Sequence, residues 1–561
     1  MKLSYKTHYR LLIAIILASI LIVPSIVAEN ENTPIITQKQ EKLKDMIQTR
    51  DLGEPGALWD YWAKSYVLPN QDLIAKAVIE NHNDYYVIAG DIREDTKRNI
   101  FLMEMDTAGA VLWFRVYDIG GSAAYDGAEE DVFSIDEVRL ASGDYGYVVT
   151  GRTDLYTFDS PVDNTMLQPG DIFVMQVNNV GDPIWLKAYK NLIHPENYQI
   201  GLEIRTCIID GDTRFFVAGS SDTPTPSNLD IIALLLDIDG NVIHYVQLDG
   251  NVDEKANAAA VQFDTSGVYS FAICGFQNPG IFGQMDPIFV ELDDNLNILN
   301  ARQYGIFDQN GNSQNDWLTS IQTTSAEEYI MCGSSYSHTG SNLESILVIR
   351  ADDDGKPKWM RTYNEMPPNG RDNRGVAIDE LQGLPDFYVL TCIRGQDPDY
   401  DLGIMGVNKT LHRLWARMLQ AGKPNFPCNT NLNGVEKTFD LRGLMDGFVL
   451  TGLSTSTEAV PNTNFPGAVV CRFDDEGYIR KNPTPCCTLE YELDEDVYDE
   501  HEEITLERTL VQYEVPEWNP SYYDDTPKVR KICTPGFEAI LLLGAISVVF
   551  VIMRKRRQDH Q

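Results

Sequence analysis

Oxygen-bearing side chains in one segment have a spacing that suits a calcium-binding loop. They stand at relative positions 1, 3, 5 and 9 of residues 308–316, and they are Asp308, Asn310, Asn312 and Asp316. Ca²⁺ takes about six to eight oxygen ligands, and a compact loop can supply several of them. Gly311 stands at position 4, whereas the usual calcium loop has its glycine at position 6, so a flexible polar loop is the alternative interpretation. Calcium is the one cofactor that the sequence suggests.

A second acidic segment suits a cation or a cationic partner. Its carboxylates are Asp126, Glu129, Glu130 and Asp131. If the chain were an extracellular hydrolase or lyase, Glu129 and Asp316 would be the first candidates for acid/base catalysis. The sequence contains no HExxH, GxSxG or Gly-rich phosphate-binding motif, so it favours a protein without catalytic activity.

A repeat with a period of about 60 residues predicts the elements that position these side chains. The recurring phrase is an apolar strand ending in a small residue and Gly, a second apolar strand, a tight turn and a strand with Trp or Tyr. The turn is Asp/Asn-x-x-Gly in five of the seven copies, and the sixth copy has Cys392 at the place of the Gly. The first copy has Gly90, the turn 106–109 and Trp113, and the last has Gly452 and the turn 474–477. An earlier apolar strand brings each copy to four strands. Seven such copies predict an all-β fold, a seven-bladed β-propeller of four-stranded blades.

The two ends of the repeat array are complementary. The last copy has no aromatic strand after Gly477, whereas residues 58–66 form an aromatic strand with no copy of its own. We therefore predict that this N-terminal strand closes the last blade, which removes open sheet edges. The predicted propeller covers residues 57–485, and an array of two-sheet sandwiches is the alternative.

The repeats resemble those of secreted and cell-surface β-propellers of bacteria and archaea, which read Gly-Tyr-x-Val-x-Gly … Asp-x-x-Gly-x-x-x-Trp. This resemblance implies a protein displayed outside the cell. The quinoprotein docking repeat has one more residue between Asp and Gly. In the sialidase Asp-box, the Asp-to-Gly and Gly-to-Trp spacings are each one residue shorter. Neither quinone binding nor glycosidase chemistry is supported.

In an antiparallel meander, alternate connections lie on the same face of the ring. The predicted turns between the first two and last two strands of each blade are short. The other connections are long and irregular in this interpretation, and they include residues 118–131, 152–170, 220–228, 305–316, 334–344, 419–433 and 453–466. Long loops on a rigid scaffold are the usual place for recognition, so we expect binding on this face.

Both ends of the sequence resemble targeting segments. Residues 1–28 have a basic start, an apolar stretch and small residues at the end, as a signal peptide does, and an uncleaved N-terminal anchor is the alternative. Residues 535–553 form an apolar transmembrane helix in this interpretation, and the basic tail 554–561 stays in the cytoplasm. The Pro-Gly-Phe that opens this helix resembles the C-terminal sorting signal of archaeal surface proteins. In that family the helix is removed and replaced by a lipid anchor. Residues 29–56 read as a polar linker and 486–534 as an acidic stalk.

In a protein displayed outside the cell, cysteines can form disulfide bonds and Asn-x-Thr sequons can be glycosylated. Disulfide candidates are Cys428, Cys486, Cys487 and Cys533, and their connectivity is left open. Cys274 and Cys332 stand before the blade Gly, where other copies have Ala or Thr, so we expect them in the core. Asn408 begins an N-glycosylation sequon at a predicted turn.

The chain has 561 residues and a formal net charge of −38, which argues against nucleic acid as a partner. Taken together, these features predict a membrane-anchored, outward-facing propeller that binds a surface protein or glycan through its long-loop face. An extracellular hydrolase or lyase and a structural surface-layer or adhesion component are the alternatives.

Overall fold

The computed structural model describes the strands of the chain and the tight turns between them. The described residues are 48–51, 61–68, 71–94, 97–117, 130–153, 170–189, 198–224, 227–248, 252–263, 269–278, 284–307, 314–337, 343–364, 371–396, 399–419, 436–454, 467–479, 488–490 and 494–498. Within these ranges no helix is long and apolar enough to span a bilayer. The predicted signal peptide, transmembrane helix 535–553 and basic tail lie outside them.

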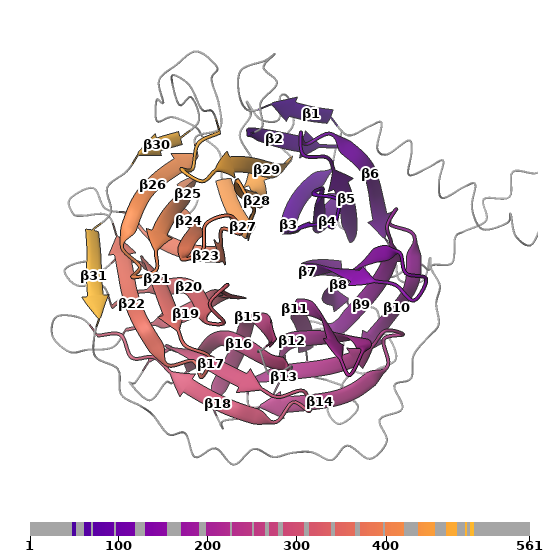
Figure 1. Cartoon of the computed structure of the whole chain (residues 1–561), viewed down its shortest axis with the longest axis horizontal. Helices are drawn as coiled ribbons and strands as arrows, with labels where there is room; N and C mark the ends of the chain where they lie inside the picture. The colour runs from indigo at the N-terminus through magenta and orange to yellow at the C-terminus, as the bar shows by residue number, and fades with distance from the viewer. Residues whose placement is uncertain are drawn as a thin grey trace, which may run out of the picture. The chain divides into compact units, whose positions relative to one another are not determined.

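Seven antiparallel sheets are arranged around a central axis, as Figure 1 shows, so the predicted seven-bladed propeller is confirmed. Blade 1 contains β3 (Asp72–Glu80), β4 (Tyr86–Glu94), β5 (Lys97–Met105) and β6 (Val111–Tyr117). Blade 2 contains β7 (Glu130–Arg139), β8 (Tyr145–Thr153), β9 (Asp171–Asn178) and β10 (Pro183–Tyr189). Blade 3 contains β11 (Tyr198–Ile209), β12 (Asp212–Pro224), β13 (Ser227–Asp237) and β14 (Val242–Leu248).

The remaining blades follow the same meander from the axis outward. Blade 4 contains β15 (Asp253–Phe263), β16 (Tyr269–Asn278), β17 (Asp286–Leu292) and β18 (Ile298–Gln303). Blade 5 contains β19 (Asp316–Thr323), β20 (Tyr329–Ser335), β21 (Ser345–Ala351) and β22 (Pro357–Asn364). Blade 6 contains β23 (Asn373–Glu380), β24 (Phe387–Gln396), β25 (Asp399–Asn408) and β26 (Arg413–Leu419). Blade 7 contains β27 (Glu436–Gly443), β28 (Gly447–Ser454), β29 (Gly467–Asp474) and the N-terminal β2 (Trp62–Val67).

Three further strands from the two ends of the ring extend the blades. The pairing of β2 with β29 joins the two ends of the ring, which confirms the predicted closure. Next to β2, β1 (Gln48–Asp51) forms a fifth strand of blade 7. Two pieces of the predicted stalk also pair: β30 (Thr488–Glu490) with β26 in blade 6, and β31 (Asp494–Tyr498) with β22 in blade 5. In Figure 1 both lie on the outer edge of the ring.

A β-bulge at one position of every innermost strand explains the recurring Gly. In blade 4 the register shifts between Ala256 and Ala258, so Asn257 bulges toward the axis beside Gly275. A Cβ on Gly275 would lie 1.8 Å from the carbonyl oxygen of Lys255, which no side chain can tolerate. The bulged residues are Lys76, Phe133, Leu202, Asn257, Thr319, Val376 and Phe439.

The aromatic outer strands of blades 7, 1, 2 and 4 dock on the turn of the next blade. The Tyr66 hydroxyl donates a hydrogen bond of 2.8 Å to the Gly109 carbonyl oxygen in blade 1, and Trp62 Nε1 donates one of 2.8 Å to Thr107 O. Tyr117, Tyr189 and Tyr304 hydroxyls bond the corresponding turns at 2.6, 2.7 and 2.8 Å. The Trp and Tyr spacing in the sequence therefore reports contacts between blades.

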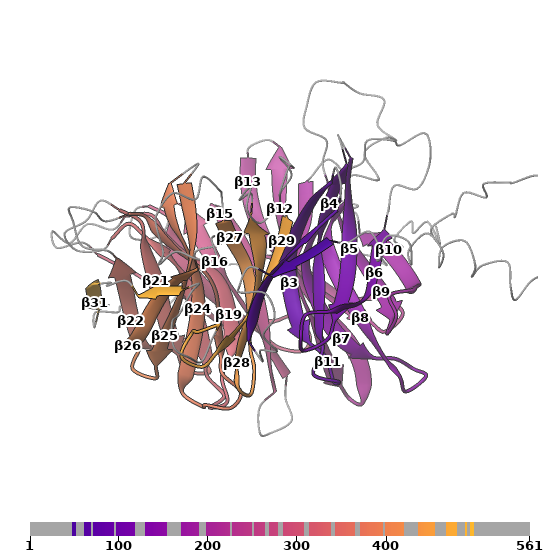
Figure 2. The same ribbon diagram turned by 90° about the horizontal axis from the view of Figure 1, so that it is seen from above.

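The turns that receive these side chains share one local structure. In blade 1, Asp106 Oδ1 accepts the backbone N–H groups of Ala108 and Ala110 at 3.0 and 2.8 Å. Asp or Asn occupies the same place in all seven blades, because its short side chain replaces a backbone acceptor. We call the face with these turns the short-turn face and the opposite one the long-loop face. Figure 2 shows the ring from the side, with the strands running between the two.

Candidate functional site

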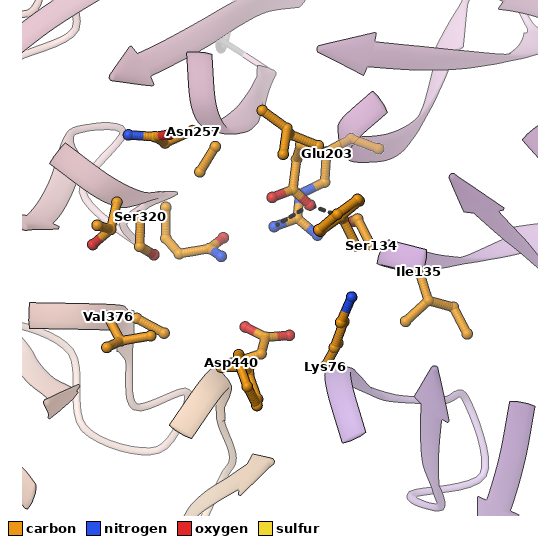
Figure 3. Close-up of a pocket in the computed structure, with 16 residues that line it drawn as sticks. Lys76, Ser134, Ile135, Glu203, Asn257, Ser320, Val376 and Asp440 are labelled. Carbon is orange, nitrogen blue, oxygen red and sulfur yellow. Dashed lines mark hydrogen bonds and ion pairs between the residues drawn. The ribbon is translucent and has the colours of Figure 1, made fainter. Parts of the chain in front are cut away.

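A cavity of about 350 Å³ lies on the axis of the propeller. All seven innermost strands line it, and each contributes the bulged residue or its neighbours. Figure 3 shows Lys76, Ser134, Glu203 and Asp440 converging on this space from four blades. The cavity thus collects side chains that are far apart in the sequence, as sites on the axis of a propeller do.

At the position that follows the bulge, two of the seven blades have a residue type that differs from the others. This position is occupied in order by Ala77, Ser134, Glu203, Ala258, Ser320, Ala377 and Asp440. Five blades thus have a small residue, whereas blades 3 and 7 have a carboxyl group. Ser320 shows the ordinary role of a polar residue here, because its Oγ accepts the backbone N–H of Ile378 in the next blade at 3.3 Å.

Glu203 is held by polar groups of blades 2 and 3. Ser134 Oγ donates to Glu203 Oε1 at 2.5 Å, and Arg205 Nη2 lies 3.4 Å from the same oxygen. Burial raises the pKa of Glu203, against the lowering effects of Arg205 and Ser134. Burial alone would lower the pKa of Arg205, but Glu203 and neighbouring aspartates raise it, so the guanidinium stays charged.

Asp440 has a different environment. Its Oδ2 accepts the backbone N–H of Val78 in blade 1 at 2.9 Å, and its Oδ1 accepts that of Leu441 at 2.8 Å. Burial raises its pKa to about 7, and the charge of Glu203 adds to this effect. The carboxyl group of Asp440 can therefore hold a proton near neutral pH, as an acid/base group does.

A cluster of charges lies where blades 1 and 2 meet, at the strand ends that lead into the long loops. Asp131 is its centre: Lys76 Nζ lies 3.2 Å and Arg152 Nη2 2.9 Å from its carboxylate, and Arg98 also forms an ion pair with it. These cations outweigh the effect of burial and lower the pKa of Asp131 to about 2. Asp91, 2.5 Å from Lys76 Nζ, has a pKa that burial raises to about 7.

Two of the four predicted carboxylates at 126–131 lie within the described residues. Glu130 and Asp131 begin β7 and are buried, and Asp131 is the centre of the ion-pair cluster. Asp126 and Glu129 lie outside the described residues. The structure thus gives Asp131 a role within the ring, and binding by the four together stays a prediction.

Of the predicted calcium ligands, the structure describes Asp316 alone. It begins β19 and is fully buried, and Ser337 Oγ donates to its Oδ2 at 3.0 Å. Burial raises its pKa to about 7. Asp308, Asn310 and Asn312 lie outside the described residues, so the calcium site stays a prediction. In the part of the chain that the structure describes, no three His, Cys, Asp or Glu side chains gather in a metal-binding group.

Asn408 occupies the Asp place of the turn in blade 6. Its Oδ1 accepts the N–H groups of Thr410 and His412 at 3.0 and 2.9 Å, and Thr410 Oγ1 donates to it at 2.9 Å. The predicted core cysteines Cys274 and Cys332 are free and buried, as expected. The disulfide candidates Cys428, Cys486, Cys487 and Cys533 lie outside the described residues.

Glu203 and Asp440 are site residues that the sequence patterns do not predict. Neither is part of a recognisable motif, and both lie in the innermost strand, which is the least regular part of the repeat. An alignment of the seven innermost strands on their bulges would have found them, because they break a series of Ala and Ser.

Comparisons with known proteins identify no family. No protein-family model matches the chain, and no curated protein matches its sequence. Among solved structures, Sqt1 of Chaetomium thermophilum is 10% identical with a TM-score of 0.35, over 72% of this chain and 95% of that one. An α-L-arabinofuranosidase of Fusarium graminearum is 10% identical with a TM-score of 0.36, over 60% and 93%. Similarity at this level carries no argument about function.

Proposed function

We propose that this protein is a binding module on the outside of the cell, which recognises a surface protein or glycan through its long-loop face. The observation that carries this proposal is the difference between the two faces. On the short-turn face, aromatic side chains of the neighbouring blade bind the turns. Tyr66 and Trp62 bind the turn of blade 1, and Tyr117, Tyr189 and Tyr304 bind those of later blades. The long connections leave from the opposite ends of the strands, where sequence can vary without disturbing these contacts.

The test is a binding screen of the full-length chain against glycans and surface proteins, with and without Ca²⁺. A variant in which Gly-Ser linkers replace residues 154–169 and 455–466 serves as the comparison. We expect this variant to lose capture and to keep the urea unfolding transition of the parent. If capture persists with both loops replaced, the assignment of the binding face is wrong.

A hydrolase or lyase is a second candidate, and one specific observation favours it. Glu203 and Asp440 line one cavity, and the pKa of each is raised. A pair of carboxyl groups is the usual apparatus of glycoside hydrolysis. Release of products from a polysaccharide panel, abolished by both Glu203→Gln and Asp440→Asn, would establish this candidate. An unchanged panel would exclude these substrates.

A further inference from the structure

The charged side chains that line the axial cavity leave one carboxyl group without a cation. Lys76 lines the cavity, but its Nζ is 2.5 Å from Asp91 and 3.2 Å from Asp131, at the end of the channel near the long loops. Arg205 forms its ion pair with Glu203. Among the described residues, no Lys, Arg or His lies within ion-pair distance of Asp440, whose contacts are the N–H groups of Val78 and Leu441.

A carboxylate buried in a protein loses hydration, and a counterion or hydrogen-bond donors must compensate for this loss. Without a counterion it takes up a proton, because the loss of hydration disfavours the charged form. Two backbone N–H groups and the more distant charge of Arg205 favour the charged form of Asp440 only in part, and burial raises its pKa to about 7. A cation that enters the cavity can therefore replace the proton at little cost near neutral pH.

The walls around Asp440 favour an organic cation over a metal ion. Phe133 and Phe439 occupy the bulged positions of blades 2 and 7 and line the same cavity. The Nζ of Lys76 lies 4.5 Å from the centroid of the Phe133 ring, so one wall already receives an ammonium group. A divalent ion would need about six oxygen ligands, whereas Ser134 Oγ, Ser320 Oγ and Glu203 Oε1 are engaged between blades.

The size of the cavity fits such a ligand. Its volume of about 350 Å³ is roughly that of ten water molecules, at about 30 Å³ each. A compact amine or a lysine-like side chain fits in this space together with some water. Larger molecules would have to leave most of their atoms outside.

We propose that the axial cavity binds a small organic cation, a primary or quaternary ammonium group, which pairs with the carboxylate of Asp440 between aromatic walls. This inference rests on the proposed function, because it gives the binding module a ligand class for its central cavity. It also explains why Asp replaces Ala or Ser after the bulge of blade 7.

The test measures binding of n-butylammonium and tetramethylammonium chloride to the full-length chain by titration calorimetry. Neutral 1-butanol is the matched ligand control. Asp440→Asn keeps an acceptor for the Val78 N–H and removes the charge, and we expect it to lower affinity for both cations about tenfold or more. Asp440→Ser, which installs the residue of blades 2 and 5, should do the same, so one folded variant is sufficient.

A matched control variant separates charge from structure. Tyr189→Phe removes a hydrogen bond between blades 2 and 3 at a residue that does not line the cavity, and it changes no charge, so we expect it to bind both cations as the parent does. Equal binding by the parent and the Asp440 variants would overturn the proposal. So would an absence of binding by both cations, or equal binding of 1-butanol.

A pH series gives a second readout. Asp440 faces Glu203 and Arg205 of β11 and Lys76 of β3, and Glu203 also has a raised pKa, whereas Arg205 stays charged. Affinity for n-butylammonium should therefore fall as the pH decreases from 8 to 5 and the carboxyl groups take up protons. A pH-independent affinity would contradict the pairing. The loop variant of the binding screen should bind the cation normally, so failure of one proposal is distinguishable from failure of the other.

Discussion

At the scale of single residues, the ring contains acidic side chains that are costly to ionise. Asp316, Asp440 and Asp91 each have a pKa that burial raises to about 7. In the unfolded chain an aspartate has a pKa of about 3.9. Between these values the folded state binds more protons than the unfolded state, so the free energy of unfolding falls as the pH rises from about 4 to 7. We expect the protein to be more stable at pH 5 than at pH 8.

Asp316→Asn isolates one of these groups. Because the carboxylate is fully buried and hydrogen-bonded by Ser337, the amide removes a charge that folding disfavours at pH 8. We expect a gain in the free energy of unfolding at both pH values, larger at pH 8 than at pH 5 by about 1–3 kcal/mol. Urea unfolding at both pH values measures it. A loss of stability at pH 8 would contradict the account of Asp316 as an uncompensated acid.

At the scale of elements, two local devices build each blade: the bulge beside a Gly, and the aromatic strand that docks on the next turn. Each leaves a trace in the sequence: an apolar strand ends in a small residue and Gly, and Trp or Tyr follows the Asp turn at a fixed offset. The bulge itself was not predicted. The bulge depends on how the innermost strand pairs with the second strand of the blade, and the sequence shows only the small residue that this pairing requires.

Gly275→Ala tests the bulge. Its Cβ would lie 1.8 Å from Lys255 O, so the strand pair must move apart, and we expect a loss of at least about 2 kcal/mol in the free energy of unfolding. Gly211→Ala is the control, because no atom lies near its Cβ and only its φ of +88° opposes the change. That variant should lose about 1 kcal/mol. Equal losses in both would show that the carbonyl contact is unimportant.

Trp62→Ala and Tyr66→Phe test the closure of the ring. Trp62 is 6% exposed and packs in the core between blades 7 and 1, so its truncation should cost about 3–5 kcal/mol. Tyr66→Phe removes the hydroxyl that bonds Gly109 O and contacts Met105 Sδ, and it should cost about 1 kcal/mol. Tyr189→Phe makes the same change away from the closure and should cost a similar amount. Unfolding curves of the three variants check this, and an unaffected Trp62→Ala would place the closure elsewhere.

At the scale of the whole molecule, the fold could be predicted because the same weak pattern of strands, turns and aromatic residues recurs along the chain. The cavity could not, because it depends on which residues of seven strands reach the axis. Asp131 illustrates the difference: its acidic segment was evident, whereas Lys76 and Arg98, which neutralise it, come from another blade. The fifth strands β30 and β31 were also missed, since the acidic composition of residues 486–534 indicated an extended stalk.

Replacement of residues 488–498 by a Gly-Ser linker of equal length tests those fifth strands. Loss of β30 and β31 would leave the outer edges of β26 and β22 unpaired. We expect faster amide hydrogen exchange in these two strands and no change in β14 and β18. Faster exchange throughout the ring would mean instead that the segment stabilises the fold as a whole.

The face on which a partner binds is measured most directly by amide hydrogen exchange of the full-length chain, with and without the strongest ligand of the screen. The account predicts protection at strand ends on the long-loop face, such as the start of β7 at Glu130 and the start of β21 at Ser345. The turns around Asp106 and Asp237 on the opposite face should exchange as before. Protection confined to those turns would contradict the proposed function.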